Sequence, residues 1–291
     1  MSRRLLTLLV AFALPLAALA CTGPEEKPDN YVDDMAREHK DDSPIKGVNG
    51  TLADEPTAEL DTQEIVYANV AGQDIKGYLA RPKGATGPLP AVIVIHEWWG
   101  LNDNVRLMTR HLAAEGYTAL AIDLYNGQAA ADPDQAKALM QKAMENLGDG
   151  VDNVQQAHGF LKDKQAASKT AVVGWCFGGA WSLRTALVLG PDLDAAVVYY
   201  GQLVTDKNEL NGLEAPLLGI FGGADKGIPA EQVSAFGAAT AELDKDVTIK
   251  VFDGAEHAFA NPSGTHYKAA EAEEAWAMTR AFLAKHLAAT Q

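Results

Sequence analysis

Cysteine is scarce in this chain: of its 291 residues only two, Cys21 and Cys176, are cysteines. Two cysteines cannot form the disulfide network that stabilises many small secreted proteins, so the fold has to rest on a hydrophobic core. With 47% hydrophobic and 22% charged residues, the chain has the balance of a globular protein and the length of about one large domain. This composition excludes a mainly disordered chain.

Basic residues are also few, with 24 lysines and arginines against 39 aspartates and glutamates and a formal net charge of −15. Such an acidic surface repels nucleic acids and anionic membranes, so we expect no nucleic-acid partner. The histidines and cysteines show no zinc-type spacing, and no glycine-rich phosphate loop occurs. We therefore predict no metal and no other cofactor.

Long hydrophobic runs are absent except near the N-terminus, where residues 5–20 are apolar and follow Arg3 and Arg4. The run is short for a membrane span and ends in small residues, which is typical of an export signal. Residues 19–23 (LACTG) are similar to a bacterial lipoprotein cleavage site, which predicts that Cys21 is lipidated and anchors the exported protein to the cell envelope. An ordinary signal cleaved nearby, or an uncleaved anchor, is the alternative.

The sequence predicts three segments. Residues 1–20 form the signal peptide, and their removal would change the formal charge from −15 to −17 because Arg3 and Arg4 are lost. Residues 21–60 are polar and rich in charge without a sustained apolar period, which favours a flexible tether. Residues 61–291 form a single folded domain.

Strand and helix patterns alternate through that domain. Residues 64–70 and 75–80 flank a turn at Gly72 and predict a hairpin. Apolar runs typical of strands buried on both faces follow at residues 91–95, 118–122, 171–173, 195–199, 217–221 and 247–252. We expect a helix capped by Asp103 and stopped by Gly116, and further helices at residues 133–146, 150–163, 178–188, 229–243 and 268–287. The alternation predicts an α/β fold with a mostly parallel sheet of about eight strands and helices on both faces.

A candidate nucleophile follows the strand at residues 171–173. The chain there reads GWCFGG, with Cys176 at the centre, and then enters a helix. A G-x-C-x-G-G run between a strand and a helix is typical of a nucleophile elbow with cysteine in place of serine. The glycines permit the sharp turn, and the helix N-terminus favours a thiolate. A glycine-rich turn with an inert buried cysteine is the alternative for this motif taken alone.

Candidate acid and base residues follow two later strands. Asp225 comes after the strand at 217–221, and His257 after the strand at 247–252. The order of nucleophile, acid and histidine is that of α/β-hydrolases, and all three would lie at the carboxyl edge of the sheet. His257 can accept the thiol proton while Asp225 orients the imidazole. His96 is a rival base, although we favour a role in fixing its loop.

The loop after the strand at residues 91–95 reads HEWWG, at the position that supplies the second oxyanion donor in this fold. We assign the two oxyanion donors to the backbone N–H groups of Trp98 and Phe177. Aromatic side chains that could form the wall of an apolar substrate pocket, or equally belong to the core, are Trp98, Trp99, Tyr125, Tyr200 and Phe259.

Taken together, these motifs make residues 64–287 similar to the dienelactone hydrolase family. The similarity rests on His96-Glu97, Asp123-Leu124-Tyr125, the run around Cys176, Tyr199-Tyr200-Gly201, Gly223-Ala224-Asp225 and Glu256-His257-Ala258-Phe259. The resemblance implies a single-domain α/β-hydrolase that works without a cofactor by forming an acyl-enzyme at Cys176. It also implies that Glu97 neighbours the thiol and helps to switch it between thiol and thiolate. A nearby carboxylate otherwise raises the pKa of a thiol.

The chain departs from this family at two positions that affect the substrate. Where the family has two arginines that bind the substrate carboxylate, the sequence has Asn126-Gly127 and Asn261. Losing that pair removes the strongest recognition element for a lactone that carries a carboxylate. The candidate replacements, among which the sequence does not decide, are Arg106, Arg184 and Lys268.

The sequence therefore predicts an exported, monomeric hydrolase that cleaves small-molecule carboxylic esters or lactones with a Cys176–His257–Asp225 triad. Thioester or amide hydrolysis uses the same attack, so both stay open. A catalytically silent lipoprotein that binds a ligand or partner on the same fold is a second hypothesis, supported by the missing arginines. A glutamine-amidotransferase-like cysteine hydrolase is a third, but the Cys-Asp-His order and the Glu97 motif favour the ester hydrolase.

Overall fold

The computed structural model describes residues 31–43 and 51–288, without the side chain of Thr51. The predicted signal peptide and Cys21 lie outside the described residues. No helix in the described part of the chain is long and apolar enough to cross a membrane.

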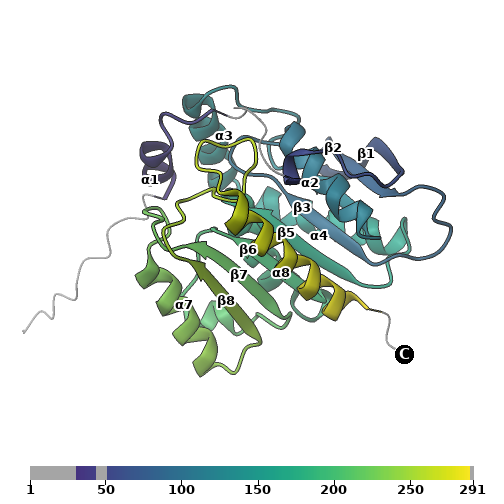
Figure 1. Cartoon of the computed structure of the whole chain (residues 1–291). Coiled ribbons are helices and arrows are strands. Elements are labelled where there is room, and N and C mark those ends of the chain that lie inside the picture. Colours follow the sequence, from purple (N-terminus) through teal and green to yellow (C-terminus); the bar gives the residue numbers. More distant parts are fainter. Residues whose placement is uncertain (1–30, 44–50, 289–291) are drawn as a thin grey trace, which may run out of the picture. The chain divides into compact units, whose positions relative to one another are not determined.

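Within the described residues, the domain is built on an eight-stranded sheet with the order β1-β2-β4-β3-β5-β6-β7-β8 (Figure 1). The strands are β1 (Leu60–Val70), β2 (Gln73–Pro82), β3 (Ala91–Ile95), β4 (Thr118–Ile122), β5 (Thr170–Trp175), β6 (Ala195–Tyr199), β7 (Leu217–Gly222) and β8 (Val247–Phe252). Strands β3 to β8 are parallel, whereas β2 pairs antiparallel with both β1 and β4. The predicted mostly parallel sheet and the hairpin before it are confirmed.

The apolar runs that predicted the central strands reflect burial on both faces of the sheet. Every residue of β3, β4, β5, β6 and β7 is buried, whereas the edge strand β8 is partly exposed. Strands covered on both sides need apolar residues at every position rather than at alternate ones. The core therefore lies on both faces of the sheet.

The helices that cover the sheet begin and end within about three residues of the predicted positions. They are α2 (Asp103–Ala114), α3 (Pro133–Glu145), α4 (Leu147–Asp163), α5 (Phe177–Leu189), α7 (Ala230–Glu242) and α8 (Ala269–Leu287). Helices α2 and α8 lie on one face and α4 and α5 on the other (Figure 1). One cap was predicted wrongly: Asn102, not Asp103, accepts the N–H of Val105 at the start of α2.

Three short elements were not predicted. They are α6 (Lys207–Leu210) and the one-turn 3-10 helices η1 (Thr51–Ala53) and η2 (Gly190–Asp192). Each has three or four residues, too few to produce a periodic pattern in a sequence.

The largest difference from the sequence prediction lies within the predicted tether. Helix α1 (Tyr31–Glu38) packs against α3, and Asp33 forms an ion pair of 2.6 Å with Lys137 (Figure 1). Tyr31, Met35 and His39 are buried. Their spacing of four residues places them on one helical face. A flexible linker is therefore wrong for residues 31–43, although the boundary proposed at residue 60 stays a prediction.

Candidate active site

Cys176 occupies a sharp turn between β5 and α5. Its backbone has φ +56° and ψ −118°, in a region that L-residues rarely adopt. A Cβ on Gly174 would lie 2.1 Å from the carbonyl oxygen of Gly178, and a Cβ on Gly178 would lie 2.2 Å from that of Ile95. Only glycine permits this close approach of backbones. The structure thus has the strand, turn and helix that a nucleophile elbow requires.

The Cys176 side chain lies at the N-terminus of α5, where the helix dipole stabilises negative charge. It is 2% exposed and forms no disulfide among the described residues. It lines the same small pocket as Glu97, Trp98 and His257. The buried thiol is thus placed beside a base and a carboxyl group.

Asp225 and His257 are paired at the carboxyl ends of β7 and β8. The imidazole Nδ1 donates to Asp225 Oδ2 at 2.7 Å, and Asp225 Oδ1 accepts the backbone N–H groups of Gly227 and Ile228, both at 2.9 Å. Burial by itself would raise the pKa of Asp225, but the His257 charge and these hydrogen bonds outweigh it and lower the pKa. Asp225 is therefore an ionised acceptor that fixes the histidine ring.

The environment of His257 stabilises the imidazolium that forms when Cys176 gives up its proton. Burial lowers the pKa of the imidazole, but the charges of Asp225 and then Cys176 outweigh this effect and raise the pKa well above its usual value. Because Nδ1 is bonded to Asp225, Nε2 is the nitrogen available to accept a proton. The Tyr200 ring contacts the imidazole with centroids 5.0 Å apart, which restricts its rotation.

Glu97 is a second buried carboxyl group in this pocket. Its Oε2 accepts a hydrogen bond from Asn261 Nδ2, and its buried Oε1 has no hydrogen-bond partner among the described residues. The Asn261 amide is held in this orientation because its oxygen accepts the N–H and the hydroxyl of Ser263, at 2.9 and 2.8 Å. Burial raises the pKa of Glu97 to about 7, against the lowering effect of His257. Near neutral pH the group can therefore be present in either protonation state.

The two predicted oxyanion donors belong to main chain beside the pocket. Trp98 lines the pocket from the turn after β3. Phe177 is the first residue of α5, where N–H groups have no acceptor within the helix. Trp98 thus lines the pocket and Phe177 directly follows Cys176, and their role as oxyanion donors stays a prediction.

Of the other aromatic residues predicted to form the pocket wall, only Trp99 lines it. Tyr200 and Phe259 are fully buried, and their rings contact each other behind His257. Tyr125 packs against His96 and Phe177 and lines a separate cavity. In this conformation Tyr200, Phe259 and Tyr125 support the site from the core rather than face a substrate.

His96 holds two loops together, as the sequence analysis favoured. The N–H of Leu124 donates to Nε2 at 3.1 Å, so Nδ1 carries the proton and donates to the carbonyl oxygen of Glu97 at 2.6 Å. Both ring nitrogens of His96 therefore form hydrogen bonds with backbone groups. His96 is fully buried and is not available as the catalytic base.

None of the candidate replacements for the missing arginines lies in the pocket. Arg106 bonds to Glu64, Arg184 lies over the Trp181 ring, and Lys268 donates to a backbone carbonyl of the loop after β8. No lysine or arginine of the described residues lines the pocket. A carboxylate on the substrate would therefore meet Glu97 and Asp42 without a compensating lysine or arginine.

Four residues that the sequence did not predict as part of the site close the pocket. His39, Asp42 and Ser43 line it from the N-terminal side, and Thr265 lines it from the loop between β8 and α8. The pocket that they close has room for about one water molecule. The buried spacing of Tyr31, Met35 and His39 was the available signal, but it is short and lies in a polar segment.

Comparison with known proteins identifies the family. The model of the dienelactone hydrolase family matches residues 75–287, which include Cys176, Asp225 and His257. The chain belongs to the dienelactone hydrolase family. It is accordingly an enzyme of the carboxylic-ester hydrolase class with the α/β-hydrolase fold.

Individual relatives span most of the domain. The chain is 34% identical over 223 residues to the protein usf of Aquifex pyrophilus, covering 74% of this chain and 95% of the relative. It is 35% identical over 222 residues to an Escherichia coli K12 protein provisionally named a carboxymethylenebutenolidase, covering 70% of this chain and 80% of the relative. A crystal structure from Klebsiella pneumoniae, provisionally described as a dienelactone hydrolase, has a TM-score of 0.71 at 28% identity and covers 78% of this chain and 99% of that one.

The family match begins at residue 75, so the whole N-terminal segment of residues 31–43 lies outside it. The matched region therefore contains the predicted triad residues, whereas the part of the pocket lining at His39, Asp42 and Ser43 lies outside it.

Proposed function

We propose that this enzyme hydrolyses neutral carboxylic esters or lactones through an acyl-enzyme on Cys176. The observation that carries the proposal is the His257–Asp225 pair, bonded at 2.7 Å, in the pocket that the elbow cysteine also lines. A nucleophile, a base and a group that orients the base are the parts that covalent acyl transfer needs.

The first half of the reaction transfers the acyl group to sulfur. His257 Nε2 takes the thiol proton, and the thiolate attacks the ester carbonyl to give a tetrahedral intermediate. The N–H groups of Trp98 and Phe177 stabilise its oxyanion. The intermediate collapses to a thioester, and the leaving alkoxide takes the proton from His257. Asp225 stays ionised and stabilises the imidazolium.

The second half repeats the same chemistry with water. His257 accepts a proton from water, the hydroxide attacks the thioester, and the thiolate leaves and is reprotonated. The products are the carboxylic acid and the enzyme in its original state. Thioesters and amides would use the same steps, so a substrate panel has to include them.

Glu97 would control the resting state of the thiol. When ionised, its charge opposes formation of a thiolate on Cys176 in the same pocket. When protonated, it removes this repulsion and can donate a hydrogen bond. Asn261 keeps the carboxyl group in place through its hydrogen bond to Oε2. Binding of an ester that displaces or protonates Glu97 would therefore activate the cysteine.

Substrate charge follows from the lining of the pocket. Glu97 and Asp42 contribute carboxyl groups, and no lysine or arginine of the described residues contributes a compensating charge. Relatives of this chain are named for a lactone that carries a carboxylate, whereas neutral esters or lactones fit this lining better.

Trapping of the acyl-enzyme tests the mechanism directly. The protein is mixed with a p-nitrophenyl ester, quenched in acid during turnover, and analysed by intact-mass and peptide mass spectrometry. We expect one acyl group on the peptide that contains Cys176. Steady turnover with the acyl group on another residue would reject the cysteine mechanism, and absence of turnover on esters, lactones and thioesters would favour the catalytically silent binding protein.

We also propose that the enzyme acts outside the cytoplasmic membrane, anchored by lipid at Cys21. The support is the apolar run of residues 5–20 and the LACTG sequence at its end.

A further inference from the structure

The N-terminal segment, residues 31–43, covers the proposed active site. The His39 ring lies with its centroid 4.7 Å from that of His257 and 5.7 Å from that of Trp98. A Cβ on Gly227, in the loop that holds Asp225, would lie 3.4 Å from Met35 Sδ. The pocket is too small for an ester, so substrate enters only if part of its lining moves, and residues 31–43 supply three of the lining residues.

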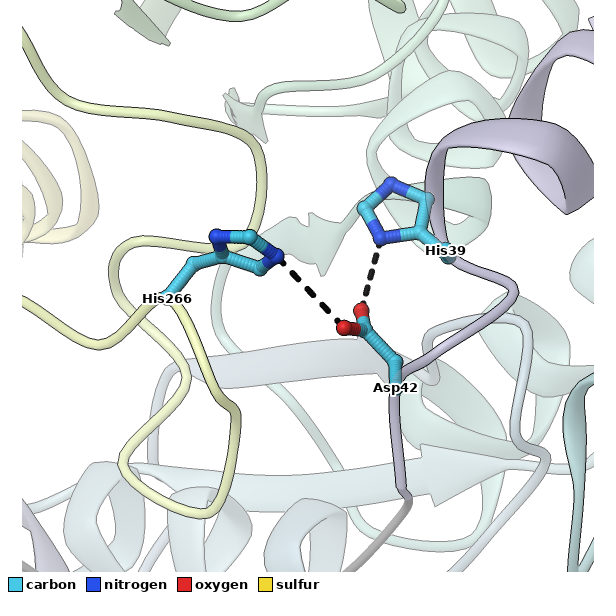
Figure 2. A group of neighbouring side chains, drawn as sticks. All are labelled: His39, Asp42 and His266. Atoms are coloured by element: carbon cyan, nitrogen blue, oxygen red, sulfur yellow. Dashed lines mark hydrogen bonds and ion pairs between the residues drawn. The ribbon is translucent and has the colours of Figure 1, made fainter.

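The contact between this segment and the domain contains a group of possible metal ligands. Figure 2 shows His39 and Asp42 from the segment facing His266 from the loop between β8 and α8. His39 Nδ1 lies 2.7 Å from Asp42 Oδ2, and His266 Nε2 lies 3.5 Å from Asp42 Oδ1. One nitrogen of each histidine and one carboxylate oxygen all lie within 4.8 Å of one another.

This donor set and its size suit a zinc-type cation. Two imidazole nitrogens and one carboxylate oxygen are usual ligands of Zn²⁺, with water in the fourth position. Bonds of about 2.0 to 2.1 Å at tetrahedral angles place neighbouring donor atoms roughly 3.4 Å apart. The His39–Asp42 and His266–Asp42 separations of 2.7 and 3.5 Å lie on either side of that value, and because they end on different carboxylate oxygens, a rotation of Asp42 would bring one oxygen toward both imidazoles. The His266 side chain is 30% exposed, so it forms the solvent-facing side of the cluster.

Neighbouring groups already orient two of the three ligands. His266 Nδ1 lies 3.1 Å from Glu256 Oε2, which holds the ring so that Nε2 faces Asp42. A carboxylate behind a histidine is a common outer-shell partner at zinc sites, where it fixes the ring and increases the basicity of the ligand. Thr265 Oγ1 donates to Asp42 Oδ1 at 2.6 Å and steadies the carboxylate.

We propose that His39, Asp42 and His266 bind a divalent cation of the zinc type, which fastens the N-terminal segment over the active site. Two ligands come from the segment and one from the domain, so the cation binds the covered state more tightly than an open one. Binding to one of two states shifts the population toward that state. The cation would therefore inhibit the hydrolase, and this last consequence rests on the proposed function.

Calorimetry with ZnCl₂ tests the site itself. Because Cys176 and His257 could bind zinc on their own, the titration uses the whole mature chain, stripped with a chelator, in a Cys176→Ala background. We expect one equivalent of Zn²⁺ to bind, and His266→Asn or Asp42→Asn in that background to weaken binding at least tenfold. The matched control is His286→Asn, which removes a histidine at the end of α8, away from the cluster. Absence of binding, or equal affinity in the cluster variants, would overturn the proposal.

Hydrogen exchange then tests whether the cation fastens the segment. Zn²⁺ should slow amide exchange in residues 31–43 of the Cys176→Ala protein and leave exchange unchanged in the form that also carries His266→Asn. Binding without this protection would overturn the fastening role. Calorimetry and hydrogen exchange do not depend on ester hydrolysis. They can therefore reject the metal site independently of the proposed function.

If the proposed function holds, Zn²⁺ should also lower kcat/KM of the protein that retains Cys176. The decrease in kcat/KM should follow the fraction of sites occupied by Zn²⁺, as measured by calorimetry. In His266→Asn the decrease should be at least tenfold smaller. Equal inhibition of both proteins would mean that zinc acts on Cys176 and His257 instead, and the inhibitory role of the cluster would be wrong.

Discussion

Cys176 is the proposed nucleophile, although its side chain is buried. At the scale of one residue, replacing it is the most direct test of the mechanism. Cys176→Ala should abolish ester hydrolysis, because the proposed acyl-enzyme forms on its thiol, while the melting temperature changes little. Initial rates on the best p-nitrophenyl ester and a thermal melt give both values. Wild-type turnover in this variant would mean that the mechanism is wrong. Cys176→Ser is a weaker test, because His257 in a site built for a thiol does not have to activate an alcohol.

Glu97 should make stability depend on pH. Its pKa rises from the ordinary 4.5 to about 7 in the folded protein because it is buried. The folded state therefore binds this proton more tightly than the unfolded state does, so the contribution is complete below pH 4.5 and is lost as pH rises to about 7. The full shift corresponds to about 3 kcal/mol of unfolding free energy.

Glu97→Gln removes that titration and keeps an acceptor for Asn261. Relative to the variant, the wild type should lose stability between pH 4.5 and 7, with the difference measured by denaturant unfolding at several pH values. Because Asp225 and His257 are present in both proteins, the difference isolates Glu97. Parallel stability curves would contradict the raised pKa.

Asn261 stands where the family has a carboxylate-binding arginine, so it should set the preference for substrate charge. Wild-type enzyme should favour a neutral ester over a matched anionic one by roughly tenfold or more in kcat/KM, since a lost charged hydrogen-bond pair is worth about 1.5 to 3 kcal/mol. Asn261→Arg should narrow this gap, and Asn261→Gln is the uncharged control. Comparison at low and moderate salt separates local binding from long-range repulsion. A wild-type preference for the anion would refute the neutral-substrate proposal.

At the scale of elements, we expect helix α1 and the residues after it to limit the entry of substrate into the pocket. Deleting residues 31–43 should raise kcat/KM for bulky esters more than for small ones, because the covering side chains of Met35 and His39 are removed. The measurement is a series of p-nitrophenyl esters of increasing acyl length. A fall in activity for every ester would show instead that the segment completes the substrate site.

A point substitution in α1 tests whether uncovering the pocket is enough, without deleting residues 31–43. Met35→Asp places a charge in the buried face of α1 and should loosen the helix, with the same direction of effect as the deletion. Arg37→Ala lies on the exposed face and should leave the ester profile unchanged.

Elements were predicted best where burial is uniform. Strands β3, β4 and β6 have the bounds that the sequence predicted, because continuous apolar runs that are buried along their whole length leave little choice. Helix α1 was missed because eight residues cannot show a sustained period, and isolated helices of that length are unstable without a surface to pack on.

At the scale of the whole molecule, the N-terminus should determine where the enzyme acts. Wild-type protein expressed in a bacterium that processes lipoproteins should partition into detergent and carry acyl chains on Cys21, whereas Cys21→Ala should be released in soluble form. Intact-mass spectrometry of the mature protein gives the modification. An unmodified N-terminus would reject the anchor and leave the hydrolase proposal unaffected.

The sequence by itself determined the α/β fold, the family resemblance and the candidate triad, because these depend on local patterns. Strand ends are visible as changes in hydropathy, and parallel strands carry their ends to one edge of the sheet. Cys176, Asp225 and His257 could therefore be grouped without coordinates. The sequence also favoured a loop-fixing role for His96, because as a catalytic base it would have to reach across from another strand.

Only the tertiary structure decided what closes the pocket and which polar groups pair inside it. The Glu97–Asn261 contact joins residues 164 positions apart, and Thr265 contacts Asp42 across 223 positions. No spacing rule relates side chains at such distances, since their approach depends on how α1 packs on the finished domain. For the same reason the sequence predicted no metal, whereas the folded chain brings His39, Asp42 and His266 within reach of one cation.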